Sequence, residues 1–505
     1  MRLDRPLAIL VFGSCVLAPL ASEAQTLTRG PEQLLPASNV HLNNTRPRVA
    51  FTADGAKHVA WVAGDVFGQE GVFVASAPSA GAAYGAAVPL AAAMDGIRYG
   101  LGDGLELDVR GDRVLVSWEG TDFDNRAMWF ARSTDLGSTW ESAVRADPDT
   151  TKERAYNTGT LFPDGRVIQS WIVYDDVTGD PSHELRVQDA NGDFLLPANP
   201  AAASPGLPCE CCNADPIVLD DGTVVVAYRN NENNQRRMYV ARSTDGGATF
   251  PASVRVDQGG SLFFACPSSP PSITAEGSDV LVVWGKVGGA SATFHAMSAR
   301  STDGGVTFAP QIQVDDSDGL TAIRHPTVAR QGDVAVAVWT GNDPVTGQPE
   351  IWAATSLDGG STWGPEEAIT GDGLGAAVSH AGVAISPADE IEIVWSDSRD
   401  GTERVYRVGA TVDATDAPMN ASLASGSAFP NPFRRTTTVR FSRPLDLDQR
   451  VLVLDVTGRI VTTLAGEGEL TWDGSSRAGS PVPSGVYYLR PEGRSEAVRV
   501  VRLRN

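Results

Sequence analysis

Short apolar strands recur along the chain at a nearly constant period. Each is a run of mostly apolar residues that ends on an aromatic side chain, and turn residues separate it from the next run. The seven runs are His58–Trp61, Val114–Trp118, Val167–Trp171, Val224–Tyr228, Val280–Trp284, Val334–Trp339 and Ile391–Trp395. Their aromatic residues lie 53 to 57 positions apart, and helical periodicity is scarcely visible. This pattern predicts a β-propeller whose blades are four-stranded sheets.

One turn phrase occurs four times between these strands. It has the form Ser-x-Asp-x-Gly-x-Thr followed by Trp or Phe, at Ser133–Trp140, Ser243–Phe250, Ser301–Phe308 and Ser356–Trp363. We expect the carboxylate to accept hydrogen bonds from backbone amides and the glycine to adopt a positive φ. The aromatic ring then anchors the turn under the sheet. The acidic residues Asp135, Asp245, Asp303 and Asp358 are therefore expected to brace blades and to do no chemistry.

The two ends of the repeated region are expected to meet. The seventh period stops at Val412 without an outer strand, and Gly30–Leu35 resembles the outer-strand opening Gly364–Ile369. A strand over residues 30–36 would complete the last blade and leave no open sheet edge. We therefore predict a closed ring of seven blades over residues 25–412, with six blades as the alternative.

The chain changes character on either side of this ring. Residues 1–24 have the pattern of a secretory signal peptide, with cleavage after Ala24 favoured over a lipoprotein-type cleavage before Cys15. Residues 413–427 are small and polar, as in a linker. Alternating strands with Gly turns then predict a small β-sandwich over residues 428–505. No other run is long enough to span a bilayer, so we expect an exported mature chain without a transmembrane segment.

Composition adds an acidic character to this picture. The 505 residues include 40 basic and 62 acidic side chains, a net charge of −22. Residues 428–505 hold 12 Arg against 8 acidic residues, so the negative charge belongs to the ring. An acidic body of this kind disfavours nucleic acid and anionic membranes as partners.

The repeated turn matches the Asp box, and the ring therefore resembles the sialidase-like Asp-box (BNR) propeller family. Sialidases proper have six blades, so the count of seven departs from that family. Residues 428–505 resemble the type A C-terminal sorting domain of the type IX secretion system, because several motifs occur in its order: Phe429-Pro-Asn-Pro-Phe433, Gly458-Arg459, Trp472-Asp473-Gly474 and Ser484–Leu489. That resemblance implies export across a Gram-negative outer membrane, followed by release or surface attachment. An ordinary accessory sandwich is the alternative.

Candidate chemistry gathers at the mouth of the ring, where inner strands start and the loops after second strands lie. The residues expected there are Arg46, Asp103, Arg154, Tyr156, Asn213, Asp215, Arg324, His325, Ser379 and His380. Arg46, Arg154 and Arg324 could clamp a carboxylate, although solvated ion pairs are the simpler interpretation. The resemblance implies such a triad for sialic acid, with an acid that Asp65 matches by position. The nucleophilic Tyr and its Glu have no convincing match, and Tyr156 and Tyr406 are candidates by type only.

Four cysteines remain in the mature chain: Cys209, Cys211, Cys212 and Cys266. Cys212 and Cys266 are 54 positions apart, close to one period, which places them on adjacent blades near the mouth. A disulfide from Cys266 to Cys211 or Cys212 is favoured in an exported chain. The alternative is a thiolate site for copper or zinc, with His325 or His380 as a further candidate ligand. Acidic, amide-rich loops such as residues 122–125 and 230–234 could bind Ca²⁺ or sugar hydroxyls, and no other cofactor is expected.

Two functions remain open from the sequence. The first is a sialidase-type exo-glycosidase, which the family resemblance favours. The second is a non-catalytic surface module that binds a glycan or a protein, which the absence of a nucleophile motif favours. They would be separated by whether the three arginines and a buried Tyr–Glu pair converge in one pocket.

Overall fold

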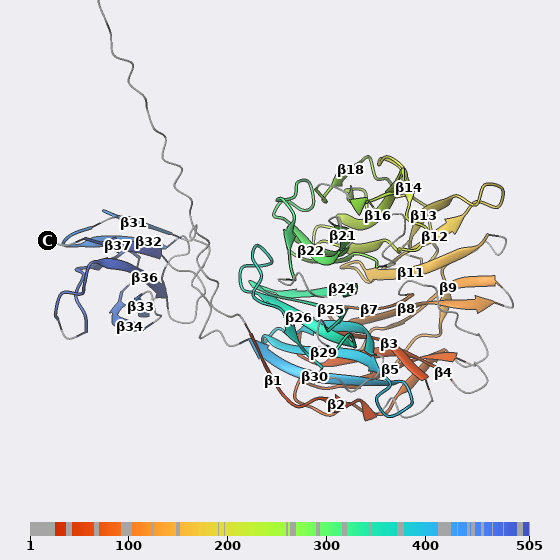
Figure 1. Ribbon diagram of the computed structural model, residues 1–505, viewed down its shortest axis with the longest axis horizontal. Helices are drawn as coiled ribbons and strands as arrows, with labels where there is room; N and C mark the ends of the chain where they lie inside the picture. Colours follow the sequence, from red (N-terminus) through yellow and green to blue (C-terminus); the bar gives the residue numbers. More distant parts are fainter. Residues whose placement is uncertain are drawn as a thin grey trace, which may run out of the picture.

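The computed structural model consists of antiparallel β-sheets (Figure 1). No helix in the described part of the chain is long and apolar enough to cross a membrane. The described residues are 26–36, 43–64, 70–91, 104–122, 125–147, 152–189, 191–195, 197–258, 261–262, 269–288, 293–315, 321–343, 346–370, 378–412, 426–431, 433–441, 445, 450–455, 459–466, 468–477, 479–491 and 498–503.

Seven sheets follow one another along residues 27–412, and the first six are each built from strands that are neighbours in sequence. The first three contain β3 (Asn43–Phe51), β4 (Lys57–Gly64), β5 (Glu70–Ala77) and β6 (Val88–Ala91); β7 (Leu105–Arg110), β8 (Arg113–Asp122), β9 (Asn125–Ser133) and β10 (Val144–Arg145); and β11 (Arg154–Leu161), β12 (Val167–Tyr174) and β13 (Pro181–Val187).

The remaining sheets repeat the same antiparallel order. The fourth has β15 (Asp215–Val218), β16 (Val224–Glu232), β17 (Gln235–Ser243) and β18 (Ala252–Arg255), extended by β14 (Leu207–Pro208) and β19 (Ser261–Leu262). The fifth has β20 (Ser272–Glu276), β21 (Asp279–Gly288), β22 (Thr293–Ser301) and β23 (Ile312–Gln313), and the sixth has β24 (Thr321–Gln331), β25 (Val334–Asn342), β26 (Pro349–Ser356) and β27 (Glu367–Ala368). The seventh has β28 (Val378–Ile385), β29 (Glu390–Asp397) and β30 (Arg404–Val412), together with β1 (Leu27–Arg29) and β2 (Gln33–Leu34).

The seven sheets form a closed ring. The inner strand of each sheet contacts the inner strand of the next, and β28 of the seventh sheet contacts β3 of the first. The aromatic residue of every second strand is buried to 2% exposure or less, and each packs in an apolar cluster that extends to a neighbouring blade. The seven-bladed propeller predicted from the aromatic period is therefore confirmed.

The N-terminal segment completes the seventh blade. Its outer strand is split into β1 and β2, which both pair with β30, with Leu27 opposite Val412 and Leu34 opposite Tyr406. The strand thus starts three residues earlier than the predicted 30–36. Leu35 is fully buried in a cluster that joins the seventh blade to the first. Closure therefore combines backbone pairing with apolar packing, and it gives the last blade its outer strand.

The Asp boxes have the predicted chemistry. In the box at Ser301–Phe308, Asp303 Oδ1 accepts from the Thr307 amide at 2.9 Å and Oδ2 accepts from the Thr307 hydroxyl at 2.6 Å. These hydrogen bonds lower the pKa of Asp303 to about 2. The box glycine has a second role, because a Cβ at Gly360 would lie 2.7 Å from Leu281 of the preceding blade. Each box therefore packs closely on its neighbour as well as bracing its own turn.

The degenerate box in the third blade keeps the turn but loses the outer strand. Asp189 Oδ1 still accepts from the amides of Asn191 and Asp193, at 2.8 and 2.9 Å. Beyond it, the described residues make isolated bridges, such as Leu185 of β13 with Ala198. Loss of the Ser and Thr hydroxyls of the motif thus accompanies a three-stranded blade.

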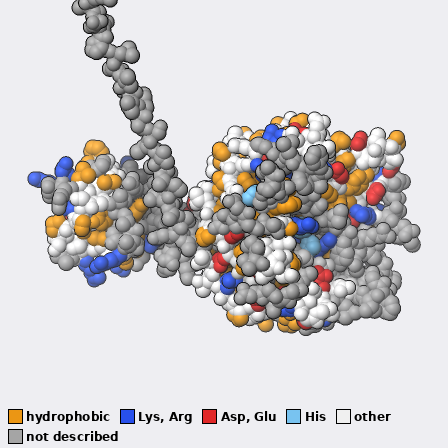
Figure 2. Space-filling model, in the orientation of Figure 1, with side chains coloured by type: hydrophobic (Ala, Val, Ile, Leu, Met, Phe, Trp, Pro, Cys, Tyr) orange, Lys and Arg blue, Asp and Glu red, His pale blue; other side chains and the backbone are white. Residues whose placement is uncertain are grey.

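Residues 426–503 form a separate β-sandwich. One sheet has β31 (Gly426–Phe429), β32 (Thr437–Phe441) and β35 (Leu470–Trp472), and the other has β34 (Ile460–Ala465), β33 (Arg450–Asp455), β36 (Gly485–Pro491) and β37 (Val498–Arg502). The two sheets share a core in which Trp472 stands between Phe433 and Tyr487. On the face in Figure 2, Arg side chains project from the edges of this body, in line with its positive net charge.

Candidate functional site

Four inner strands carry the same irregularity at the mouth. A β-bulge interrupts the register of β3, β11, β24 and β28 just after their first residues. The residues in these bulges with a left-handed backbone include Arg46, Tyr156, His325 and His380, with φ of 56°, 66°, 50° and 53°. A left-handed conformation at a non-glycine residue costs about 1–3 kcal/mol, and such bulges re-aim side chains next to functional sites. These four residues, which the sequence analysis placed at the mouth, therefore all lie in β-bulges of the inner strands.

A cavity of about 180 Å³ lies just below these bulges, in the centre of the ring. In each blade, one inner-strand residue pairs with the residue just before the buried aromatic, and these seven residues lie at the level of the cavity. They are Arg48, Glu106, Thr158, Asp215, Ser272, Thr327 and Gly382. All of these except Thr158 line the cavity, together with Asn213 and His325 on the mouth side. The lining is rich in hydroxyl, amide and charged groups, which suits a polar ligand.

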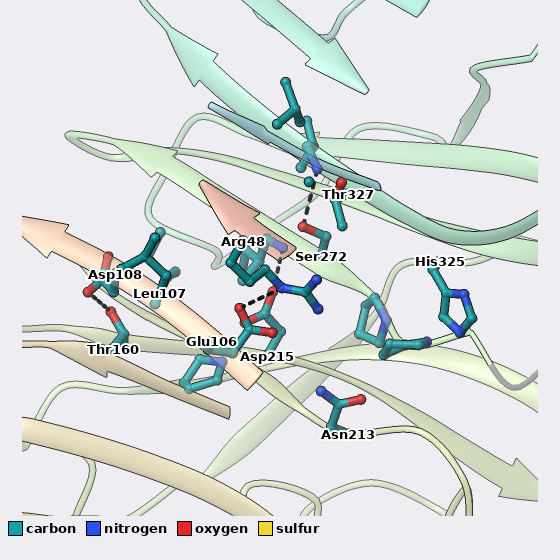
Figure 3. A pocket seen from close by; sticks show the side chains of 18 of the residues that line it. Arg48, Glu106, Leu107, Asp108, Thr160, Asn213, Asp215, Ser272, His325 and Thr327 are labelled. Carbon is teal, nitrogen blue, oxygen red and sulfur yellow. Dashed lines mark hydrogen bonds and ion pairs between the residues drawn. The ribbon is translucent and has the colours of Figure 1, made fainter. Parts of the chain in front are cut away.

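Two carboxylates and one guanidinium converge in this cavity. Figure 3 shows the side chains of Arg48, Glu106 and Asp215 close together, with Arg48 Nε 3.4 Å from Glu106 Oε2. Asp215 Oδ2 accepts a hydrogen bond from the Ile273 amide at 2.9 Å. Burial, and then the Glu106 carboxylate, raises the pKa of Asp215 well above its usual range. Asp215 is enclosed by the protein, although part of its surface stays open to the cavity.

A third carboxylate in the cavity has a structural role. Asp108 Oδ2 accepts from the Thr160 hydroxyl and from the Leu161 amide, both at 2.8 Å. These bonds join the inner strands of the second and third blades. Asp108 is therefore fixed as an acceptor between two neighbouring blades.

A Tyr–Glu contact is present at the mouth, but its geometry differs from that of a nucleophile and its base. Glu119 is 2% exposed, and its Oε2 accepts from the backbone amide of Tyr156 at 2.8 Å. Arg126 lies 3.4 Å from the other oxygen of Glu119. Burial, and then the nearby Cys211, raises the pKa of Tyr156 to about 12. A phenol with a raised pKa is poorly suited to act as a nucleophile.

The three clamp arginines have unlike environments. Arg154 is 1% exposed, donates to the Lys152 carbonyl and lies 3.5 Å from the buried Asp147. This ion pair occupies its guanidinium inside the protein, which argues against contact with a ligand. Arg324 is exposed, and Arg46 is partly exposed beside the bulge of β3. Asp65 and Asp103 lie outside the described residues.

The predicted metal candidates fall into two groups. The rings of His325 and His380 stack with centroids 4.9 Å apart, and His380 Nδ1 is 2.8 Å from the Ser379 hydroxyl. The sulfurs of Cys209, Cys211 and Cys212 lie within 4.8 Å of one another, and neither histidine belongs to that group. Cys266 lies outside the described residues, so its proposed disulfide stays a prediction. Tyr406 stacks on Trp395 in the seventh blade and bonds to Asp400 at 3.2 Å, a packing role.

Sequence reasoning named Asp215 and Asn213 but missed Arg48 and Glu106. A signal for both is present, because the cavity residues lie twelve or thirteen positions before each buried aromatic. Comparing only those positions across the seven periods would have shown Arg, Glu, Thr, Asp, Ser, Thr and Gly in one ring.

The chain resembles proteins of known structure in its fold. No protein-family model and no curated protein sequence matches the chain. Similar solved structures include an ulvan lyase (12% identity, 76% of this chain and 94% of that one, TM-score 0.48) and a protein of unknown function from Dyadobacter fermentans (12%, 77% and 99%, 0.44). Another is a mutant of NanB sialidase from Streptococcus pneumoniae (7%, 79% and 72%, 0.42). At these identities and scores, the matches assign no role to any residue here.

Proposed function

We propose that the chain is an exported glycan-directed propeller that holds a terminal sugar in the channel cavity and hydrolyses its glycosidic bond. The observation that carries this proposal is the pair of carboxylates in one polar cavity, with the pKa of Asp215 raised and Glu106 beside Arg48. Glycoside hydrolysis uses one protonated and one ionised carboxyl group, and unlike environments assign the two roles.

In this proposal Asp215 acts as the general acid and gives its proton to the leaving-group oxygen. Glu106 accepts a proton from the water that attacks the anomeric carbon, so the bond cleaved and the bond formed balance as a hydrolysis. Arg48, Ser272 and Thr327 line the same cavity, where their polar groups would face sugar hydroxyls or a ring carboxylate. The roles assigned to Arg154 and Tyr156 by the sialidase resemblance are not part of this proposal.

A non-catalytic glycan-binding module is the second candidate. It is favoured by the raised pKa of Tyr156 and by the buried ion pair of Arg154. A sialidase-type mechanism would need Tyr156 as its nucleophile and Arg154 as one of its clamp arginines. The same cavity would then bind a sugar without cleaving it.

Export remains part of the proposal. The support for sorting through residues 428–505 is a self-contained sandwich core together with the ordered motifs of the sequence. The proposed destination is the outside of a Gram-negative cell, where a surface glycan would be within reach.

The test is hydrolysis by the full chain of a panel of fluorogenic glycosides, covering sialosides, uronides, arabinosides and neutral hexosides. We expect turnover of at least one class of glycoside. Because the cavity is small, the product should be a single sugar released from the end of the glycan chain. Inactivity across the panel combined with binding on a glycan array would select the second candidate. If the chain showed neither turnover nor binding, both candidate functions would be contradicted.

A further inference from the structure

Three cysteines lie in one anchored turn at the mouth end of the fourth blade. The short strand β14 pairs with Asn230 and Asn231 of β16, and the Cys209 amide then donates to the Arg229 carbonyl at 2.8 Å. The backbone carbonyl of the next residue, Glu210, accepts from the Tyr174 hydroxyl of the third blade at 2.7 Å. The turn is thus tied to two blades, which fixes the positions of its side chains before any ligand binds.

The sulfur spacing fits a shared metal ion. All three Sγ atoms lie within 4.8 Å of one another, and Cys209 Sγ is 3.8 Å from Cys211 Sγ. Metal–sulfur bonds of about 2.3 Å place two ligand sulfurs about 4 Å apart in trigonal or tetrahedral geometry. A disulfide needs about 2.05 Å, so 3.8 Å is a ligand spacing and not a bond.

The surroundings also suit a thiolate site. Cys209 and Cys212 are fully buried, whereas Cys211 is partly exposed and packs against Tyr156 and Tyr174. The buried sulfurs exclude water, and the exposed one leaves a path of entry for an ion. Arg126 is close enough to affect the ionisation of both tyrosines, and it supplies positive charge near the turn.

We propose that Cys209, Cys211 and Cys212 together bind one Cu(I) ion. Soft thiolate sulfur selects Cu(I), Zn²⁺ and iron–sulfur clusters, and Zn²⁺ is only a borderline-soft ion. Among the described residues the group contains three sulfurs and neither a carboxylate nor an imidazole. Such a sulfur donor set favours Cu(I), the softer ion. This site is distinct from the acid pair of the cavity, so it stands whether or not the chain cleaves a glycan.

The experiment is a titration of the reduced full chain with Cu(I) under anaerobic conditions, in competition with bicinchoninate. We expect one equivalent to bind and X-ray absorption at the copper edge to show sulfur as the only donor. Cys211→Ser should weaken binding by more than the ~10–100-fold that loss of an outer-shell partner causes. The matched control is Glu210→Gln in the same turn, which should leave the affinity unchanged because no carboxylate ligates the ion.

Several results would overturn the proposal. One is a disulfide between Cys266 and Cys211 or Cys212 in the exported protein, detected by peptide mass spectrometry without reduction. Others are oxygen or nitrogen donors in the absorption spectrum, zinc that Cu(I) does not displace, and copper retained by Cys211→Ser. The absorption measurement uses the unaltered protein, so it decides the matter even if a variant fails to fold.

Discussion

Replacing Glu392 by alanine should lower the free energy of unfolding of the propeller by about 3–5 kcal/mol. Glu392 is 2% exposed and lies on β29 of the seventh blade, where its Oε2 is 3.3 Å from Nζ of Lys57 on the first blade. Its Oε1 accepts from Arg407 at 2.7 Å and from the Tyr84 hydroxyl at 3.2 Å. Lys57 is fully buried, and that burial lowers its pKa while Glu392 opposes the shift. Removing Glu392 leaves a buried ammonium without its nearest counter-charge.

The measurement is chemical denaturation of the full chain followed by tryptophan fluorescence, since the buried aromatics of the blades report on the ring. The matched control is Glu390→Ala, which removes the same group from an exposed position two residues earlier on the same strand. We expect that change to stay within about 0.5 kcal/mol. Equal stability of the two variants would show that the joint between the last and first blades does not depend on this network.

Replacing Asp215 by asparagine should reduce turnover by about 100-fold or more, because it removes the general acid from the cavity. Glu106→Gln should have an effect of similar size through loss of the base. Asn keeps an oxygen that can accept from the Ile273 amide, so the local structure is maintained. The control is Asp220→Asn, the same substitution at an exposed carboxylate beyond the end of β15, which should retain full activity. If Asp215→Asn retained full activity, Asp215 would not be the general acid.

The same substitution should stabilise the protein at neutral pH. The pKa of Asp215 is raised in the folded state, so ionisation of this group costs stability as the pH rises above its ordinary value of 3.8. Asn cannot ionise, and the gain in melting temperature should therefore be largest near pH 7 and vanish below pH 4. A loss of activity with a gain in stability would distinguish a functional acid from a structural one.

The propeller could be predicted because its signals are local and repeated. Each blade carries its own buried aromatic, and each Asp box closes its hydrogen bonds within five residues, as Asp303 does with Thr307. Even the ring closure had a local signal, since Gly30–Leu35 repeats the opening of an outer strand.

The candidate site was harder to predict because it is assembled across the ring. Arg48 and Glu106 are 58 positions apart and meet only when the inner strands surround one channel. Arg154 has the sequence position of a ligand-binding arginine, yet it is buried and forms an ion pair with Asp147. The Lys57–Glu392 pair spans 335 positions and has no signal in either segment alone.

Amide hydrogen exchange tests the central claim most directly, measured on the full chain with and without the glycan selected by the panel or array. If the channel cavity holds the sugar, protection should appear at the starts of β7, β15 and β20, which carry Glu106, Asp215 and Ser272, and in the middle of β24 around Thr327. The Asp-box turns should not change. Protection confined to those turns or to the outer strands would place the ligand elsewhere and contradict the account.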